Sequence, residues 1–310
     1  MILALVLATE VALGEGLQIQ GGGTVPKGKS LTLKVKSRKQ ATEIRWFQVI
    51  PDVSRYYKNA NHPWEENPYK WVGFGQIDYE RREIEAARGK WELKLFDPDD
   101  PKSPPLKPSK AANHFRRDLG SFWFEVEVDV AGKTLRSPGL EDRDQRGLPP
   151  KMCRVTVEDG EDYLGHLSGF FNVPGVFGSI PYQCANYLGV DCADVLVAAR
   201  NAWKGVPNKK DYNVSMLVSQ WPKVASTEVV KGKPSKTLRW GKEVRRGDWI
   251  AVRYEGRTRF QHIGALFEDS DGDGVLGEED LVVHAGPHAL HTVELGRGSF
   301  DGNVVILRPE

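Results

Sequence analysis

The sequence predicts an N-terminal all-β sandwich followed by a C-terminal α+β domain. Two observations carry this prediction. Between residues 17 and 158, apolar residues alternate with polar ones in short runs, which is the pattern of half-buried strands. From residue 159 to 310, one helical pattern around Cys192 is followed by further strand patterns, an order that is typical of α+β domains.

Composition limits the classes of partner. A chain of 310 residues is long enough for two domains, and 40% hydrophobic with 27% charged residues is the balance of a soluble globular protein. The formal net charge of +1 gives no electrostatic reason to expect a nucleic-acid partner. Three cysteines are too few for a disulfide scaffold.

Residues 1–16 begin with an apolar run that is too short to cross a bilayer. We interpret this segment as part of a signal peptide, although no basic residues precede the apolar run. The expected location is therefore secreted, periplasmic or in the cell envelope. No other segment is long and apolar enough to be transmembrane, so we expect a protein that does not span the membrane.

The first predicted domain covers residues 17–158. Its alternating apolar residues include Leu31, Leu33, Val35, Phe122, Phe124, Val126 and Val128. With Trp46 in a central strand, the arrangement resembles an immunoglobulin-like sandwich in architecture. The aromatic-rich segment 51–71, which includes Tyr56, interrupts the strands. We favour the interpretation that it covers an open edge of the sandwich, and a binding surface is the alternative.

The second predicted domain covers residues 159–310 and contains a helix that starts at a cysteine. Asp191 is a good N-cap, Cys192 follows it in the first turn, and apolar residues repeat with helical spacing as far as Ala202. The positive end of a helix dipole favours thiolate over thiol, so Cys192 is a candidate nucleophile. The alternative is that Cys192 is one more small apolar residue of a buried helix.

Two histidines that follow this helix are candidate partners for the thiol. His262 and His284 each lie in a predicted strand, and a hairpin of these strands would place both imidazoles on one face. In such an arrangement His262 takes the thiol proton, which leaves a thiolate–imidazolium pair, and His284 orients His262. The alternative is that the two histidines are unrelated.

Five segments in order resemble the NlpC-type cell-wall cysteine peptidases, which have a papain-like fold. The segments are Pro174-Gly-Val-Phe-Gly178, Gly189-Val-Asp-Cys192, Arg246-Gly-Asp-Trp-Ile250, His262-Ile-Gly264 and Val283-His-Ala285. The resemblance implies a papain-like C-terminal domain in which Cys192, His262 and His284 hydrolyse amide bonds without a catalytic cofactor. It also implies that the substrate is a peptidoglycan stem peptide or another peptide amide.

One position departs from the family pattern. The family often has a tyrosine after the proline of the first segment, where it polarises the substrate carbonyl, whereas this chain has Gly175. We expect either Tyr182 or the Cys192 backbone N–H to take over this role, with Asp191 close to the same substrate-binding region.

Residues 269–280, which we call the calcium loop, match the EF-hand pattern. Oxygen ligands are expected from Asp269, Asp271 and Asp273, from Val275 at position 7, and from Asp280 at position 12. Asp280 is shorter than the usual glutamate, so weak Ca²⁺ binding outside the cytoplasm is expected. The ion would be structural and would fix the strands that carry His262 and His284.

Several alternatives remain open at this stage. Cys184 is interpreted as structural, with a Cys184–Cys192 redox switch as the alternative. A zinc site that uses His284, His288 and His291 is a weaker hypothesis, because no carboxylate or cysteine lies at matching spacing. For the whole protein, a catalytically decayed surface module that binds glycan or protein, or an acyltransferase with the same three residues, competes with the hydrolase.

Overall fold

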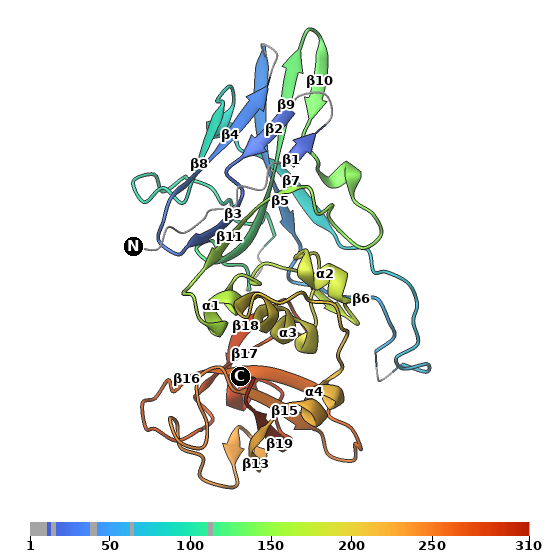
Figure 1. Ribbon diagram of the computed structural model, residues 1–310, viewed down its shortest axis with the longest axis vertical. Helices are drawn as coiled ribbons and strands as arrows, with labels where there is room; N and C mark the ends of the chain where they lie inside the picture. Colours follow the sequence, from blue (N-terminus) through green and yellow to red (C-terminus); the bar gives the residue numbers. More distant parts are fainter. Residues whose placement is uncertain (1–10, 14–16, 38–41, 63–64, 111–113, 310) are drawn as a thin grey trace.

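The computed structural model describes residues 11–13, 17–37, 42–62, 65–110 and 114–309. The molecule is mostly β, with 37% of its residues in strands and 14% in helices. Figure 1 shows the N-terminal sheets at one end of the long axis, the short helices in the middle, and the C-terminal strands at the other end.

Two sheets form the N-terminal part. The first is antiparallel, in the order β1 (Val11–Leu13), β2 (Leu17–Gln20), β4 (Leu31–Ser37) and β8 (Glu92–Leu95). The second has the order β3 (Gly23–Pro26), β11 (Cys153–Glu158), β9 (Gly120–Val130), β5 (Glu43–Pro51) and β7 (Tyr79–Glu83), with β10 (Lys133–Arg136) paired to β9. The β3–β11 pair is parallel.

The apolar pattern of these strands places their side chains between the sheets. Leu33 of β4, Leu95 of β8, Trp46 of β5 and Phe124 of β9 are all fully buried. The indole N–H of Trp46 donates to the carbonyl of Lys90 at 2.9 Å, so the buried ring keeps its hydrogen bond. The alternating residues that predicted these strands therefore do form the core.

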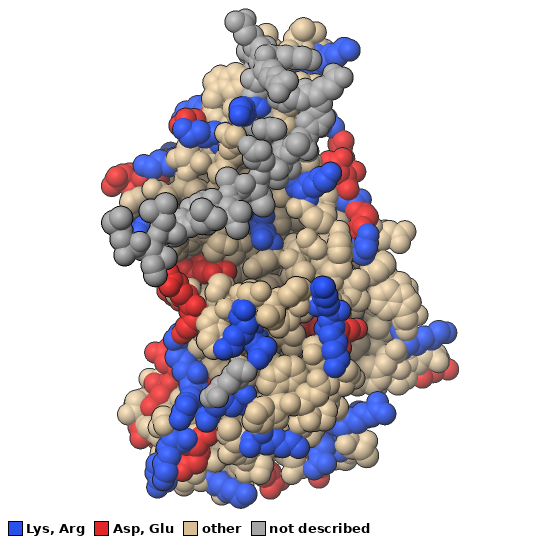
Figure 2. Space-filling view, viewed as in Figure 1, with Lys and Arg blue, Asp and Glu red and all other residues tan. Residues whose placement is uncertain are grey.

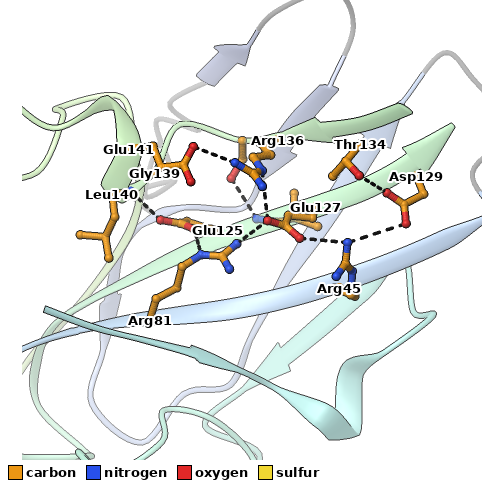
Figure 3. A network of polar contacts seen from close by, with 12 residues as sticks. Arg45, Arg81, Glu125, Glu127, Asp129, Thr134, Arg136, Gly139, Leu140 and Glu141 are labelled. Atoms are coloured by element: carbon orange, nitrogen blue, oxygen red, sulfur yellow. Dashed lines mark hydrogen bonds and ion pairs between the residues drawn. The ribbon is translucent and has the colours of Figure 1, made fainter. Parts of the chain in front are cut away.

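Strand β9 is buried on both faces, which the alternating pattern did not indicate. Glu125 and Glu127 lie between its apolar residues and are each only 5% exposed. Figure 3 shows that both carboxylates contact arginines of other strands: Glu125 contacts Arg81 of β7, and Glu127 contacts Arg81, Arg45 of β5 and Arg136 of β10. We call Arg45, Arg81, Arg136, Glu125 and Glu127 the carboxylate–arginine network.

Four helices lie between the N-terminal sheets and the C-terminal strands. They are α1 (Tyr163–Ser168), α2 (Pro181–Ala185), α3 (Cys192–Trp203) and α4 (Val214–Gln220). Three short 3-10 helices are η1 (Glu85–Ala87), η2 (Leu140–Asp142) and η3 (Leu295–Arg297). None of the helices in the described residues is long and apolar enough to span a membrane.

A seven-stranded antiparallel sheet forms the C-terminal part. Its order is β14 (Lys233–Pro234), β13 (Lys223–Val230), β19 (Gly302–Leu307), β15 (Trp249–Arg253), β16 (His262–Glu268), β17 (Leu281–His284) and β18 (His291–Glu294). A separate parallel pair joins β6 (Tyr56–Lys58) to β12 (Gly175–Phe177), so a strand from the first half of the chain reaches the second half.

The predicted fold class is wrong. We expected an immunoglobulin-like sandwich followed by an α+β papain-like domain, but the molecule is mostly β, with few helices and with one sheet curled into a half-barrel. The expectation extrapolated from the single strong helical pattern at Cys192. In the structure α3 has 12 residues and each of the other α-helices has seven or fewer, so no helical layer balances the sheets.

One apolar core joins the two halves. It contains Leu17 of β2, Phe122 of β9, Ala199 of α3 and Leu307 of β19. The boundary that we placed between residues 158 and 159 stays a prediction. Most of the segment interpreted as a signal peptide, residues 1–10 and 14–16, lies outside the described residues.

Surface charge agrees with the near-neutral composition. On the face shown in Figure 2, Lys and Arg side chains are spread among Asp and Glu side chains. This distribution matches the formal net charge of +1.

Candidate active site

The start of α3 is built as the sequence predicted. Asp191 caps the helix, because its Oδ1 accepts the N–H groups of Ala193 (3.0 Å) and Asp194 (2.9 Å). Ser179 fixes this turn, since its hydroxyl accepts the N–H of Asp191 (3.0 Å) and donates to the buried Asp194 (2.9 Å). The helix continues one residue beyond Ala202 and then meets Gly205, whose φ of +65° ends it.

Asp191 therefore caps the helix, as expected. Burial raises its pKa to about 7 despite the two backbone N–H groups that favour the carboxylate. Its expected place close to the substrate-binding region stays a prediction.

Cys192 lies half-buried in the first turn of α3, against β16. Burial raises the pKa of its thiol above the usual range, and the charge of Asp191 raises it further. The backbone N–H of Ile263, the residue after His262, opposes these effects. Because desolvation outweighs the helix dipole, the structure favours a neutral thiol, and the expected resting thiolate–imidazolium pair is wrong.

The two candidate histidines lie side by side, as the hairpin model predicted. His262 begins β16 and His284 ends β17, and these strands are antiparallel neighbours. Nε2 of His262 lies 2.9 Å from Nδ1 of His284, so one nitrogen donates to the other. This contact uses Nε2 of His262, so Nδ1 is the ring nitrogen that does not face His284.

The surroundings keep both rings neutral. Burial lowers the pKa of His262 to about 4, with a smaller effect from His291. Burial and the charges of His262 and His291 lower the pKa of His284, which is only 2% exposed. Gly264 makes room for this packing, since a Cβ there would lie 3.0 Å from Cβ of His284.

A tyrosine that the sequence analysis did not assign lies at this site. Tyr56 of β6 lies opposite Gly175 of β12 in the parallel pair. A Cβ on Gly175 would lie 2.9 Å from Cδ2 of Tyr56, and a Cβ on Gly286 would lie 3.0 Å from its hydroxyl oxygen. Tyr56 therefore fills the space beside the position where the family has its tyrosine.

The ionisation of Tyr56 is coupled to the charges at the start of α3. Burial raises the pKa of Tyr56 well above its usual value, and the charges of Cys192 and Asp191 add to this. One partial signal was present in the sequence, the aromatic-rich segment 51–71, which we interpreted as cover for a sheet edge. Nothing in the local pattern indicated that this segment pairs with residues 175–177.

Tyr182 lies on α2, and the guanidinium of Arg146 lies 4.4 Å from the centre of its ring. Its expected role beside the substrate carbonyl stays a prediction. The charge of Cys192 raises the pKa values of two other tyrosines, Tyr56 and Tyr254.

The calcium loop connects β16 to β17, so it closes the hairpin that carries both histidines. Carboxylate oxygens of Asp269, Asp271 and Asp273 lie within 4.8 Å of one another. Their other contacts are backbone N–H groups, for example from Gly274 to Asp269 (3.0 Å) and from Val275 to Asp273 (2.6 Å). The three carboxylates are a donor set that suits Ca²⁺.

Asp280 differs from its expected role as the twelfth-position ligand. Its side chain is 1% exposed. Oδ1 accepts the N–H of Ser270 (3.1 Å), and Oδ2 accepts the N–H of Gly277 (2.9 Å) and the indole N–H of Trp240 (2.9 Å). In this arrangement Asp280 holds the two ends of the calcium loop together.

The remaining cysteines are structural. Cys184 is fully buried, 3.5 Å from the hydroxyl of Ser179 and 3.4 Å from the carbonyl of Gly189. Cys153, Cys184 and Cys192 are all free thiols. The burial of Cys184 is consistent with a structural residue, and the choice between this interpretation and a redox switch stays a prediction.

No protein-family model, curated protein or solved structure matches this chain. The resemblance to NlpC-type peptidases therefore rests on the five short sequence segments alone.

Proposed function

We propose that this protein is a secreted cysteine hydrolase that cleaves amide bonds, with Cys192 as nucleophile, His262 as general base and His284 as the residue that orients His262. The observation that carries this proposal is the 2.9 Å contact between the rings of His262 and His284, together with a thiol at the start of α3 that contacts the backbone N–H of Ile263, the residue after His262. A nucleophile, a base and a group that orients the base are the parts that covalent catalysis requires.

The reaction starts from a neutral thiol and a neutral imidazole. The sulfur of Cys192 attacks the amide carbon while its proton passes to Nδ1 of His262. For this step His262 carries its hydrogen on Nε2 and donates it to Nδ1 of His284, which stabilises the imidazolium that forms. His262 then returns the proton to the leaving nitrogen as the C–N bond breaks, and water hydrolyses the thioester.

Two donors are available for the oxyanion of the tetrahedral intermediate. One is the backbone N–H of Cys192 at the start of α3, and the other is the hydroxyl of Tyr56. Burial keeps Tyr56 protonated, so at neutral pH it remains a hydrogen-bond donor.

The substrate class comes from the resemblance to NlpC-type peptidases, which act on peptidoglycan stem peptides. A secreted, periplasmic or cell-envelope location follows from the same substrate. Ca²⁺ in this proposal is structural: it would bind Asp269, Asp271 and Asp273 and stabilise the β16–β17 hairpin, and it takes no part in the chemistry.

The direct test compares wild-type protein with Cys192→Ala on purified peptidoglycan stem peptides, with products identified by mass spectrometry. We expect cleavage by the wild type and none by Cys192→Ala, with Cys153→Ala as the matched control because Cys153 is buried in β11. Equal cleavage by Cys192→Ala would refute the proposal.

The raised pKa of Cys192 favours a second candidate, a decayed hydrolase that binds cell-surface glycan or protein without cleaving it. Wild-type protein that sediments with peptidoglycan but releases no product would support this candidate. Acyl transfer by the same three residues is distinguished by adding a primary amine and searching for its conjugate with the stem peptide.

A further inference from the structure

Five histidines gather at the end of the β16–β18 strands, and we call His114, His262, His284, His288 and His291 the histidine cluster. The chain has seven histidines in total, so most of them meet here. The ring centres of His114 and His291 lie 4.5 Å apart, and those of His284 and His291 lie 4.4 Å apart. His288 lies 4.8 Å from His114 and 5.9 Å from His291.

We propose that His114, His284, His288 and His291 bind one divalent transition-metal ion of the zinc type. The spacing supports this directly. A Zn–N bond of about 2.1 Å, with about 1.1 Å more from nitrogen to ring centre, puts tetrahedral ligand rings about 5 Å apart. Four of the six ring separations, between 4.4 and 5.9 Å, lie around this value, and His284 contributes one of them, to His291.

One buried nitrogen of the cluster, Nδ1 of His288, has no hydrogen-bond partner within the part of the chain that the structure describes. In His284, Nδ1 contacts His262, and the ring also has a backbone contact with Gly286. A buried polar nitrogen without a partner is unfavourable, and a metal ion would satisfy the nitrogen of His288.

His291 already has the outer contact that is typical of a metal ligand. Its Nδ1 lies 2.9 Å from the carbonyl of Ala289 and must donate to it, which leaves the lone pair on Nε2. Ligating histidines usually donate their other N–H to a carbonyl in this way.

The site is reachable and needs only a small adjustment. His114, His288 and His291 are each half-buried, so an ion can reach them from solvent. Within the described residues, the one group whose donor atoms already lie within 4.8 Å of one another is the aspartate trio of the calcium loop. Metal binding therefore requires the imidazole rings to rotate until their nitrogens converge.

Metal at this site would change the tautomer of the base, a consequence that rests on the proposed function. If Nε2 of His284 binds the ion, its Nδ1 carries the hydrogen and donates to Nε2 of His262. Neutral His262 must then carry its own hydrogen on Nδ1, where it cannot accept the proton of Cys192. Metal would thus hold the enzyme in an inactive state.

The test uses full-length protein saturated with Ca²⁺, so that the calcium loop is occupied, and titrates it with Co²⁺ followed by visible absorption. We expect one equivalent bound with the intense bands of tetrahedral coordination, and at least tenfold weaker binding in His291→Ala and in His114→Ala. His166→Asn is the control, because His166 lies on α1 and pairs with Glu158. Circular dichroism checks that each variant folds. If an alanine variant does not fold, His288→Gln, a milder change at a third ligand, is titrated in its place.

The possible results test the metal site and its proposed effect on the tautomer of His262 separately. Binding that is absent in the wild type, unchanged in both alanine variants, or lost in Asp271→Ala instead would overturn the metal site. Nitrogen-15 NMR of the histidine rings with Zn²⁺ then tests the tautomer, for which we expect the hydrogen of His262 to move from Nε2 to Nδ1. A metal-bound protein in which His262 keeps its Nε2 hydrogen would overturn the link to catalysis and leave the hydrolase proposal untouched.

Discussion

The carboxylate–arginine network and the histidine cluster are both sets of titratable groups in largely buried surroundings. They differ in how the charged form is treated: the network pairs opposite charges, whereas the histidine cluster has no opposite charge and its rings are neutral. In the network, Glu127 contacts Arg81 at 2.8 Å, Arg45 at 3.1 Å and Arg136 at 3.2 Å (Figure 3). In the histidine cluster the rings contact one another, and burial lowers the pKa values of His114, His262, His284 and His291.

The difference separates structural from chemical use of polar groups. Charges that are paired stay ionised, and their hydrogen bonds fix the strands that carry them. Imidazoles that are buried without an opposite charge become neutral and keep a lone pair that can accept a proton or bind a metal. We therefore expect changes in the network to affect stability and changes in the histidine cluster to affect chemistry.

The largest effect is expected for His262→Ala. Removal of the general base should slow stem-peptide cleavage by about 10²–10⁴-fold, while the free energy of unfolding changes little. Cleavage rates measured per folded molecule provide the test. If Glu127→Ala lowers the rate per folded molecule as much as His262→Ala does, the proposed separation of roles fails.

The next effect is a loss of stability in Glu127→Ala. The change leaves three arginines without their shared carboxylate, and breaking a buried pair costs about 3 kcal/mol at the lower end of the usual range. We choose the lower end because the arginine side chains are 29–52% exposed. Urea unfolding measures the loss, and Glu141→Ala, whose side chain is 78% exposed, should change stability by less than about 0.5 kcal/mol. Equal stability of the two variants would contradict this view of the network.

A smaller effect on rate is expected for Tyr56→Phe. Loss of one of two oxyanion donors should lower the cleavage rate about tenfold or somewhat more, since the Cys192 N–H remains. Tyr182→Phe is the matched comparison, because Tyr182 lies on α2 with its ring against Arg146. A larger loss in Tyr182→Phe than in Tyr56→Phe would reverse our assignment of the two tyrosines.

The smallest effect concerns His166, a histidine outside the cluster that does have a carboxylate partner. Its contact with Glu158 raises its pKa above the usual value of about 6.5. A raised folded-state pKa adds stability that is fully present below pH 6 and is lost as the pH rises through the folded-state pKa. We expect the free energy of unfolding to fall by less than about 1 kcal/mol between a pH below 6 and a pH above the folded-state pKa of His166. Urea unfolding at several pH values measures this fall, which should be absent in His166→Asn.

Local signals predicted the parts of the site that depend on nearby residues. The cap at Asp191, the helix at Cys192 and the hairpin that pairs His262 with His284 all follow from short-range patterns. The position of Tyr56 did not follow, because it depends on the parallel β6–β12 pair between distant segments. The position of His114 in the histidine cluster did not follow either, because it depends on a contact between segments that are far apart in the sequence.

Two further predictions failed because they depend on burial and on the whole fold. The helix dipole at Cys192 is a local feature, but the pKa of the thiol is set mainly by desolvation, which only the packed structure reveals. The α+β class failed because one helix of 12 residues was taken to represent the C-terminal half, where strands predominate.

The most direct test of the account is covalent labelling of Cys192 by a stem-peptide analogue that carries a chloromethyl ketone. Because the resting thiol is neutral, labelling at pH 7 requires His262 to accept the proton. We predict a single adduct on Cys192, none on the buried Cys153 and Cys184, and a rate at least tenfold lower in His262→Ala. Labelling of Cys192 at the same rate in His262→Ala, or no labelling of Cys192 at all, would contradict the claim that these two residues act together.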